Sequence, residues 1–480
     1  MSYRVFKKSF LFLPKQIMFW LIRNNYCYIM ALFYKSFIIK EQKSKDNRMF
    51  TNSDRATILA INANTFRGDV ECLSQVGNYR ILTLNNNWQT LLMAAFTNKS
   101  IDAPEYFKAQ VGDDMYELKE KIDKFFSGFI LSLLKLIKID CVIAPNFRYI
   151  EDFPWVMHFE KRGIPHIMLY REGLLEFERM VCVFNNRLSK FKGYPVTHVI
   201  VTNQKCKHSF VETGFISERQ VSVHGSLRMD YLLKQINLTK GRFVSKYKGR
   251  RKRVILFYFS CYSSIFGKDN FAGNVDHPYV TNYPYIGVVW SRRKDLFRDL
   301  HISFIRLAQK LPDVDFVIKV KPEVVVKNNA SWREYLKIVN EMDNDLRKLK
   351  NYTTELDANV HDLILNSDVV IALQSSTAIE SAIAGKPVIF PLFYNYKESE
   401  NFNEFLWHNH LDLFDVAEGA DELEAMIIKR LNNSEIDGWE MEGRRKLFKD
   451  CFGDLDGCAL KNYAETIENV VTSAKTQRSK

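Results

Sequence analysis

The stretch DVVIALQSSTAIESAIAGKPVIF, residues 368–390, shows most clearly how this chain folds. After Asp368, residues 369–373 form an apolar run of strand length, and residues 374–377 follow as a polar turn. A helical pattern comes next, which Gly385 ends and Pro387 prevents from continuing. The last residues form a second apolar strand. This order of strand, turn, helix and strand predicts a parallel α/β unit.

The polar turn has two interpretations, which use the same helix start. Thr377 and Glu380 fit a capping box, with Thr377 as the N-cap and Glu380 at the third helical position. A helix that begins after a strand also presents free N–H groups and a positive dipole end to phosphate. Ser375, Ser376 and Thr377 add hydroxyl donors there beside Gln374, and Glu380 can accept from ribose hydroxyls. The turn therefore predicts a helix cap, a phosphate site, or both.

The same rhythm extends over most of the chain, which at 480 residues is too long for one hydrophobic core. Apolar runs alternate with helical patterns, which predicts parallel sheets covered on both faces. We expect strands at 56–62, 79–84, 141–146, 164–173, 197–203, 220–226, 254–260, 314–322, 368–373 and 387–390. The predicted fold is α/β, with two Rossmann-like doubly wound domains, 51–239 and 250–450, facing a cleft. A helix in 451–480 is expected to pack back on the first domain.

Ligands of open parallel sheets bind beyond the carboxyl ends of the strands, so the loops there hold the candidate residues. Ser260, Ser263 and Ser264 follow the first strand of the second domain and either form a turn or face a phosphate. Lys319 and Lys321 end a strand that we expect beside the strand of the opening stretch, and alternation points them to one side. They are predicted to neutralise a diphosphate or an acidic sugar, or to be solvated.

The first domain offers the candidate catalytic carboxylates. Glu172 ends a strand facing the second domain and suits a base or nucleophile, unless it pairs with Arg171 or Arg179. Asp230 is a second candidate, in a stretch that otherwise forms the hinge between the domains. The residues assigned to the acceptor are Asn64, Arg67 and Arg171.

The first 50 residues carry much of the net charge of +12, because they contain ten basic residues and only two acidic ones, Glu41 and Asp46. Aromatic apolar patches lie between the charges, but none reaches the roughly 18 residues of a membrane span, and no cleavage site follows. This pattern suits an interfacial helix on an anionic membrane, with residues 1–45 in contact. The alternatives are helices packed on the protein itself or a poorly ordered extension.

Several classes of site are not expected. The eight cysteines are scattered without paired or metal-type spacing, which predicts reduced thiols in the cytoplasm and no metal site. Residues 240–253 hold eight basic residues and no acidic one, a pattern of a linker or solvated loop. No nucleic-acid motif accompanies them, so no nucleic-acid partner is predicted.

Five stretches between about residues 146 and 457 resemble, in order and spacing, the GT-B-fold superfamily of bacterial surface-polysaccharide enzymes. They are GIPHIMLYREGL, VIVTNQKCKHSFVETGFISERQVSVHGSLRMDYL, FVIKVKP, SDVVIALQSSTAIESAIAGKPVIF and FGDLDG. The group includes capsule and O-antigen Kdo transferases, polyol-phosphate transferases and UDP-N-acetylglucosamine 2-epimerases. The resemblance implies a nucleotide sugar in the second domain, with Glu380 on the ribose and residues 375–377 on phosphate. It also implies acceptor binding and catalysis in the first domain.

Two departures from the group bear on the substrate. Many relatives have Lys-Pro-His-Pro or Lys-x-His-Pro where this chain has Lys319-Val-Lys321-Pro322, so a histidine ligand of phosphate is missing. The epimerases have a Gly-Gly pair and two adjacent glutamates where this chain has Ser376-Thr377 and Glu380-Ser381. The second departure argues against an epimerase. The donor stays open between CMP-Kdo, another acidic sugar and a UDP-sugar.

The function expected from sequence and resemblance is a metal-independent, cofactor-free glycosyltransferase. It would move a sugar from a nucleotide-sugar donor to a cell-surface polysaccharide, a lipopolysaccharide or a lipid-linked glycan. The expected location is cytoplasmic and peripheral on the inner membrane face. The alternatives are a nucleotide-sugar 2-epimerase or polyol-phosphate transferase of the same fold, and a non-catalytic binding or scaffold protein.

Overall fold

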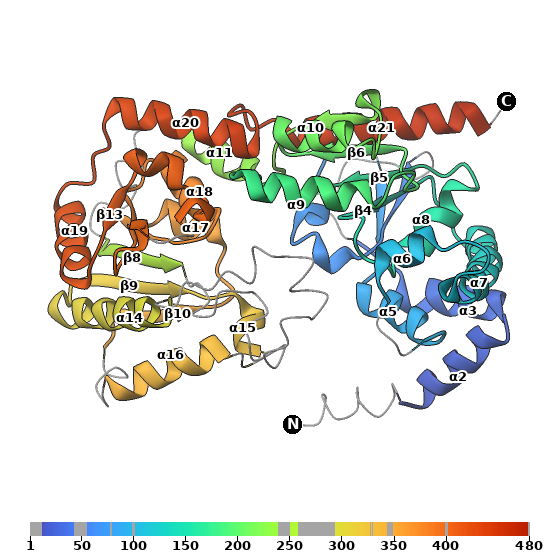
Figure 1. Cartoon of the computed structure of the whole chain (residues 1–480), viewed down its shortest axis with the longest axis horizontal. Coiled ribbons are helices and arrows are strands. Elements are labelled where there is room, and N and C mark those ends of the chain that lie inside the picture. The colour runs from blue at the N-terminus through green and yellow to red at the C-terminus, as the bar shows by residue number, and fades with distance from the viewer. Residues whose placement is uncertain are drawn as a thin grey trace.

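Two lobes, each built round one sheet, lie side by side (Figure 1). The computed structural model describes residues 12–42, 55–76, 79–97, 101–238, 250–257, 293–326, 328, 330–342, 349–398 and 402–478. The predicted α/β fold with two Rossmann-like domains is confirmed, because each lobe holds a parallel sheet with helices on both sides.

The first sheet has the strand order β1-β3-β2-β4-β5-β6-β7. Its strands are β1 (Lys40–Glu41), β2 (Ala56–Ala60), β3 (Tyr79–Thr83), β4 (Cys141–Ala144), β5 (His166–Leu169), β6 (His198–Val201) and β7 (Val221–Val223). All neighbours are parallel except β1, which runs antiparallel to β3. The order reverses between β2 and β4, so the ligand crevice of this sheet is expected beyond the ends of those two strands.

Alternation along β2 divides the apolar side chains of the first lobe between two layers. Leu59 faces the aromatic cluster under α7 and α8, whereas Ile58 faces the layer formed with α4 and α21. The helices of this lobe are α2 (Phe12–Arg23), α3 (Cys27–Phe33), α4 (Asp69–Leu73), α5 (Asn86–Ala94), α6 (Ala103–Lys108), α7 (Asp114–Leu136), α8 (Phe153–Glu160), α9 (Glu178–Ser189) and α10 (Gln204–Glu212). A π-helical turn, η1 (Tyr34–Ile38), follows α3.

The second sheet is entirely parallel, with the order β10-β9-β8-β11-β12-β13. Its strands are β8 (Lys252–Phe257), β9 (Val314–Lys319), β10 (Tyr352–Glu355), β11 (Val369–Ile371), β12 (Val388–Pro391) and β13 (Asp415–Ala417). Counted from β8, this is the 3-2-1-4-5-6 order of dinucleotide-binding folds. The order reverses between β8 and β11, which places the opening stretch of sequence at the switch point.

The helices of the second lobe cover this sheet on both faces. They are α14 (Arg293–Lys310), α15 (Pro322–Val326), α16 (Ala330–Glu341), α17 (Val360–Leu365), α18 (Thr377–Ile383), α19 (Ala420–Asn432) and α20 (Gly438–Phe452). The chain then returns as α21 (Ala459–Arg478), so that α20 lies over the second lobe and α21 over the first (Figure 1). Tyr463, Ile467 and Val471 of α21 are buried against the first sheet.

Two expectations about the second sheet were wrong. The strand β9 is not the neighbour of β11, because β8 lies between them. The basic residues at the end of the predicted linker are not all solvated loop: Lys252 and Arg253 begin strand β8, and Arg253 pairs with Asp315 at 3.5 Å. Residues 239–249 of that linker lie outside the described part of the chain.

Candidate functional site

The hydroxyl-rich turn follows β11 at the switch point of the second sheet. Gln374, Ser375, Ser376 and Thr377 are each partly exposed there, immediately before the buried helix α18. Ser375 Oγ and Thr377 Oγ1 lie 2.8 Å apart and share a hydrogen bond. Because ligands of such sheets bind beyond the switch point, these side chains are well placed to meet one.

The capping box predicted for this helix was wrong. The N-cap is Ser376, which has helical φ and ψ and makes no side-chain capping bond, and Thr377 is already helical. Free N–H groups were also predicted at the start of this helix, but three of these amides are already paired within the turn. The amides of Thr377, Ala378 and Ile379 donate to Ser375 Oγ, Ser375 O and Ser376 O at 3.0–3.3 Å. A phosphate would therefore meet mainly hydroxyl groups at this turn.

Glu380 lies beneath the turn and is 4% exposed. Its Oε1 accepts from Ser376 Oγ at 3.0 Å, and its Oε2 lies 3.2 Å from His361 Nε2 of α17. Burial raises the pKa of the Glu380 carboxyl, but the hydrogen bond and charge of His361, the charge of Arg228 and the Ser376 bond together lower it below its ordinary value. Glu380 is thus held ionised directly behind the turn, and its contact with a ribose stays a prediction.

Arg228 belongs to the stretch that was predicted to form the hinge, with no binding role of its own, and it lies between the two sheets. Leu227 packs in the core of the first lobe and Met229 in that of the second, so Arg228 sits where the chain crosses. Its Nε is 3.6 Å from Asp69 Oδ1, and its charge also reaches Glu380. The side chain is 41% exposed. A partly exposed guanidinium whose charge acts on Glu380, behind the hydroxyl turn, is suited to an anionic ligand.

The other residues predicted to bind the donor have different surroundings in the structure. Lys319 ends β9 and donates to the backbone oxygens of Val320 and Leu356, and burial lowers its pKa. Lys321 lies beyond the strand and is exposed. The three serines predicted after the first strand of this domain lie outside the described residues; they are Ser260, Ser263 and Ser264.

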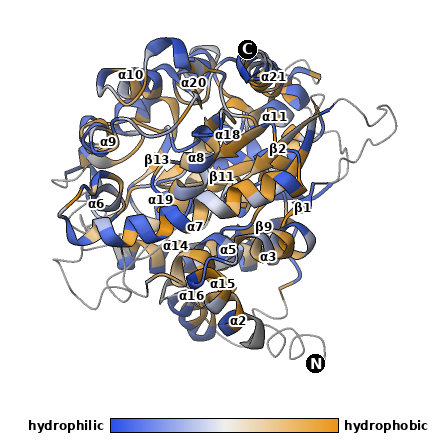
Figure 2. Ribbon diagram, turned by 90° about the vertical axis from the view of Figure 1, so that its right-hand side faces the viewer, coloured by the Kyte–Doolittle hydropathy of each residue, from blue (hydrophilic) through white to orange (hydrophobic). Residues whose placement is uncertain are grey.

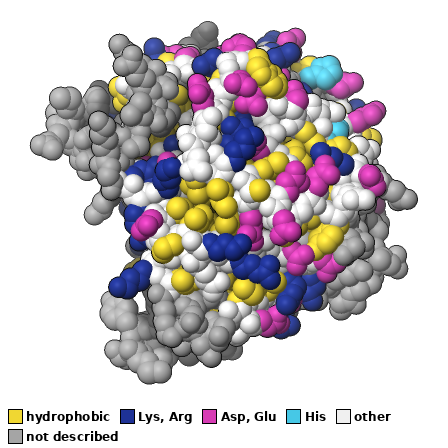
Figure 3. Space-filling view, turned by 90° about the vertical axis from the view of Figure 1, so that its left-hand side faces the viewer, with side chains coloured by type: hydrophobic (Ala, Val, Ile, Leu, Met, Phe, Trp, Pro, Cys, Tyr) yellow, Lys and Arg dark blue, Asp and Glu magenta, His cyan; other side chains and the backbone are white. Residues whose placement is uncertain are grey.

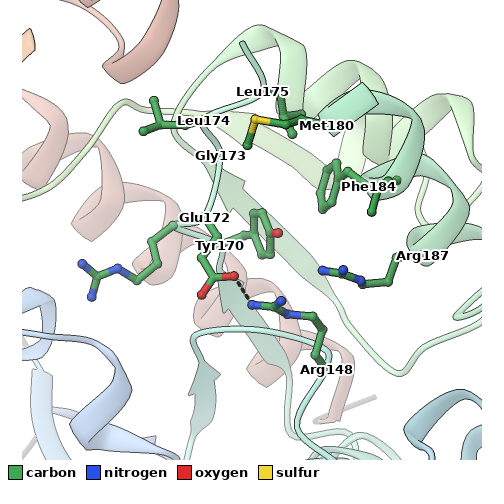
Figure 4. Close-up of a pocket in the computed structure, with 11 residues that line it drawn as sticks. Arg148, Tyr170, Glu172, Gly173, Leu174, Leu175, Met180, Phe184 and Arg187 are labelled. Carbon is green, nitrogen blue, oxygen red and sulfur yellow. Dashed lines mark hydrogen bonds and ion pairs between the residues drawn. The ribbon is translucent and has the colours of Figure 1, made fainter. Parts of the chain in front are cut away.

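A pocket of about 240 Å³ opens in the first lobe beyond β5 (Figure 4). Figure 4 shows Leu174, Leu175 and Met180 at one end of it and the guanidinium groups of Arg148 and Arg187 at the other. The lining also includes Tyr170, Arg171, Glu172, Gly173, Val183 and Phe184. This combination of an apolar wall with a few charged groups is typical of sites for organic ligands.

Glu172 lies in this pocket and forms an ion pair with Arg148 Nη2 (Figure 4). Asn146 Nδ2 lies 3.5 Å from the same carboxylate oxygen. Pairing with Arg171 or Arg179 was an alternative for Glu172; the partner that the structure gives it is Arg148, which was missed although it follows strand β4 in the sequence. With 47% of its side chain exposed, Glu172 is open to a ligand while Arg148 fixes its orientation.

Residues predicted to bind the acceptor lie in the loop after β2 or contact it. Arg171 donates to the backbone oxygens of Thr65 and Phe66 and lies 3.5 Å from Asp69 Oδ2; burial lowers its pKa. The side chain of Asn64 exchanges hydrogen bonds with Asn86 at the start of α5. The last of the three, Arg67, is exposed and has a left-handed φ of 50°. Their contact with an acceptor stays a prediction.

Asp230 is buried, and its carboxylate accepts hydrogen bonds from the start of helix α21. Its two carboxylate oxygens accept from the amides of Ala459 and Leu460 at 3.1 and 2.8 Å. These are N–H groups of the first turn, which lack partners within the helix. The structure thus gives Asp230 a capping role that joins the C-terminal helix to the start of α11 (Met229–Leu238). Its predicted catalytic role gains no support from this position.

The described residues also limit the chemistry that this site can perform. They contain no group of three or more His, Cys, Asp or Glu side chains that could hold a metal ion. The chemical groups on hand are a carboxylate and arginines in the first lobe, and hydroxyls with a buried glutamate in the second. They allow proton transfer and the binding of anions.

No family model and no curated protein matches this chain. Among solved structures, it is similar to UDP-GlcNAc 2-epimerase from Neisseria meningitidis bound to UDP-GlcNAc (13% identity, TM-score 0.42, covering 86% of this chain and 100% of that chain). It is also similar to the wall teichoic acid polymerase TagF (12%, 0.46, 98% and 99%). A third is a UDP-forming trehalose-phosphate synthase from Burkholderia xenovorans (11%, 0.42, 88% and 100%).

Proposed function

We propose that this chain is a glycosyltransferase that moves a sugar from a nucleotide-sugar donor to a glycan or lipid-linked acceptor. The observation that carries the proposal is the position of the hydroxyl turn, residues 374–377, at the switch point of a sheet with dinucleotide-binding order. Arg228 reaches the same region from the first lobe. In this proposal the donor therefore binds to the hydroxyl turn of the second lobe, and Arg228, where the chain crosses between the lobes, is its charged partner.

In this proposal the donor phosphate meets Ser375, Thr377 and Arg228, and the buried Glu380 orients the turn through Ser376. A guanidinium pairs well with phosphate or carboxylate oxygens, so an acidic sugar such as Kdo on CMP is our preferred donor. This preference no longer rests on Lys319, whose ammonium group is bound to backbone carbonyls.

The acceptor is assigned to the pocket of the first lobe, with Glu172 as the base. Its carboxylate takes the proton of the acceptor hydroxyl as the acceptor oxygen bonds to the anomeric carbon of the sugar. The bond between that carbon and the nucleotide phosphate breaks, and the phosphate leaves with the electron pair beside Arg228. Arg148 orients Glu172 through their ion pair. An epimerase would need no acceptor in this pocket.

A thermal-shift panel tests the donor half of the proposal. The full chain is melted with CMP, CDP, UDP and GDP, and one of them is expected to raise Tm by roughly 2–5 °C at saturating concentration. A Ser375→Ala/Thr377→Val double variant should lose this shift, whereas Ser434→Ala, an exposed loop position, should keep it. If none of the four nucleotides stabilises the wild-type chain, the proposal of a nucleotide-sugar enzyme is wrong.

A further inference from the structure

The N-terminal helices carry an exposed apolar face. Of the fifteen large hydrophobic side chains that are exposed in the described residues, seven lie between positions 17 and 37. We call these seven side chains the N-terminal apolar face: Ile17, Trp20, Tyr26, Tyr28, Ile29, Leu32 and Phe37. Soluble proteins seldom gather exposed apolar side chains so densely without a partner. Five of them lie on α2 and α3, Tyr26 lies between these helices and Phe37 in the turn η1. The helices α2 and α3 lie on the outer side of the first lobe (Figures 1 and 2).

The opposite side of the same helices is firmly packed. Ile22, Met30 and Tyr34 are buried in the core of the first lobe. Tyr34 Oη donates to Trp88 O and Arg23 Nε to Ala95 O, each at 2.8 Å, which fixes the helices to α5 and the residue after it. The N-terminal apolar face is therefore held outward by a stable core. The alternative, that these helices pack on the protein itself, therefore holds for one side of them.

The charge around this face has one sign. Residues 1–40 contain seven Lys and Arg and no Asp or Glu. In the described part, Lys15, Arg23, Lys35 and Lys40 are exposed among or beside the apolar side chains. The far end of the second lobe differs, since charges of both signs are interspersed there (Figure 3). An apolar surface with a basic rim is complementary to a layer of lipid tails under anionic headgroups.

We infer that the N-terminal apolar face lies on an anionic lipid bilayer. The aromatic rings occupy the headgroup boundary, as Trp and Tyr do in membrane proteins, and the lysines contact the phosphates. The stacked rings of Trp20 and Tyr26, 5.0 Å apart, join the end of α2 to the start of α3 and give one continuous contact. None of the described helices is both long and apolar enough to cross a membrane, which agrees with contact from one side.

This contact would position the rest of the first lobe. Helix α5 binds the N-terminal helices through Trp88 O, and its first residue, Asn86, exchanges hydrogen bonds with Asn64 beyond β2. One helix thus separates the lipid face from the carboxyl edge of the first sheet. Lipid binding does not depend on the proposed transferase activity, so the two fail or succeed separately.

The test is co-sedimentation of the full chain with vesicles of phosphatidylcholine alone or with 30% phosphatidylglycerol added, a composition on the order of natural anionic membranes. The wild-type chain should bind the anionic vesicles at least about tenfold more tightly than the neutral ones. Trp20→Ser/Phe37→Ser should weaken binding about tenfold or more, since each replaces an exposed apolar ring. Trp439→Ser, an equally exposed tryptophan on α20, should bind as wild type.

A charge pair separates lipid headgroups from other causes. Lys15→Glu/Lys35→Glu should bind anionic vesicles about tenfold or more weakly, whereas Lys429→Glu/Lys446→Glu, with the same change of net charge on the second lobe, should not. Equal Tm values confirm that the variants are folded. Equal binding of the wild type and Trp20→Ser/Phe37→Ser would overturn the inference. A wild-type dimer in sedimentation velocity that this variant dissociates would overturn it too, because a second chain would then cover the face.

Discussion

Arg228 Nε lies 3.6 Å from Asp69 Oδ1, and this contact ties the crossing point of the chain to the loop beyond the first sheet. Arg171 contacts the other oxygen of the same carboxylate at 3.5 Å. Burial raises the pKa of Asp69, while the two arginines oppose the rise. Asp69 therefore fixes Arg228 at the entrance to the second lobe, and a donor phosphate would find a guanidinium already in place.

Replacing Arg228 with Gln should weaken binding of the stabilising nucleotide roughly 10- to 100-fold, because a charge-assisted hydrogen bond is lost. Titration calorimetry measures the effect. The Tm without ligand should change little, since the side chain is partly exposed. Arg219→Gln, an exposed arginine of the same lobe, is the matched control. Unchanged affinity in Arg228→Gln would remove this residue from the donor site.

Glu172→Gln should lower kcat by about 10²- to 10⁴-fold, the range for loss of a general base. Nucleotide binding should be unaffected, because the proposed donor site lies in the other lobe. Glu178→Gln, at the exposed start of α9, should retain full activity. Transfer at the wild-type rate by Glu172→Gln would show that another group takes the proton.

Asp230→Ala should destabilise the chain by about 2–4 kcal/mol, because two amides at the start of α21 lose their acceptor. Hydrogen exchange should accelerate at Ala459 and Leu460 before it does so in the first sheet. Asp421→Ala on the exposed surface of α19 is the control. A catalytic aspartate would behave differently: its loss would abolish activity and leave the Tm and the exchange of α21 unchanged.

The pH dependence of stability should reveal the raised pKa of Asp152. Asp152 is fully buried, accepts from Asn62 Nδ2 and Gln89 Nε2, and burial raises its pKa well above 3.8. Its contribution to stability is therefore complete below the unfolded pKa and is lost as pH rises through the folded one. The Tm of Asp152→Asn minus that of wild type should increase between pH 4.5 and 8. A difference that is flat or falls with pH would contradict this sign.

The strands were predictable because parallel strands buried on both faces are apolar throughout, and each predicted strand exists with shifted ends. Order within a sheet was not predictable, since nothing local in the sequence says that β8 separates β9 from β11. Two strands of the second sheet were also missed. Both β10 and β13 are short, and their residues are mostly only partly buried, so they lack the long apolar signal.

The site was only partly predictable, for a related reason. Its loops follow from the rule that ligands bind beyond strand ends, and a pocket around Glu172 does lie beyond the end of β5. Pairings across the fold do not follow from it. The partner of Glu172 is Arg148, 24 residues away, and Asp230 meets an amide 229 residues on. Such partners depend on how helices and loops pack, which local sequence patterns do not encode.

The central claim, transfer of a sugar from a nucleotide, is tested most directly by proton NMR of the reaction itself. The full chain is incubated with nucleotide sugars, CMP-Kdo among them, with and without a bacterial membrane extract as the source of acceptor. We predict release of free nucleotide only when the extract is present. Conversion of the bound sugar to its epimer without release, or no change despite nucleotide binding, would contradict it.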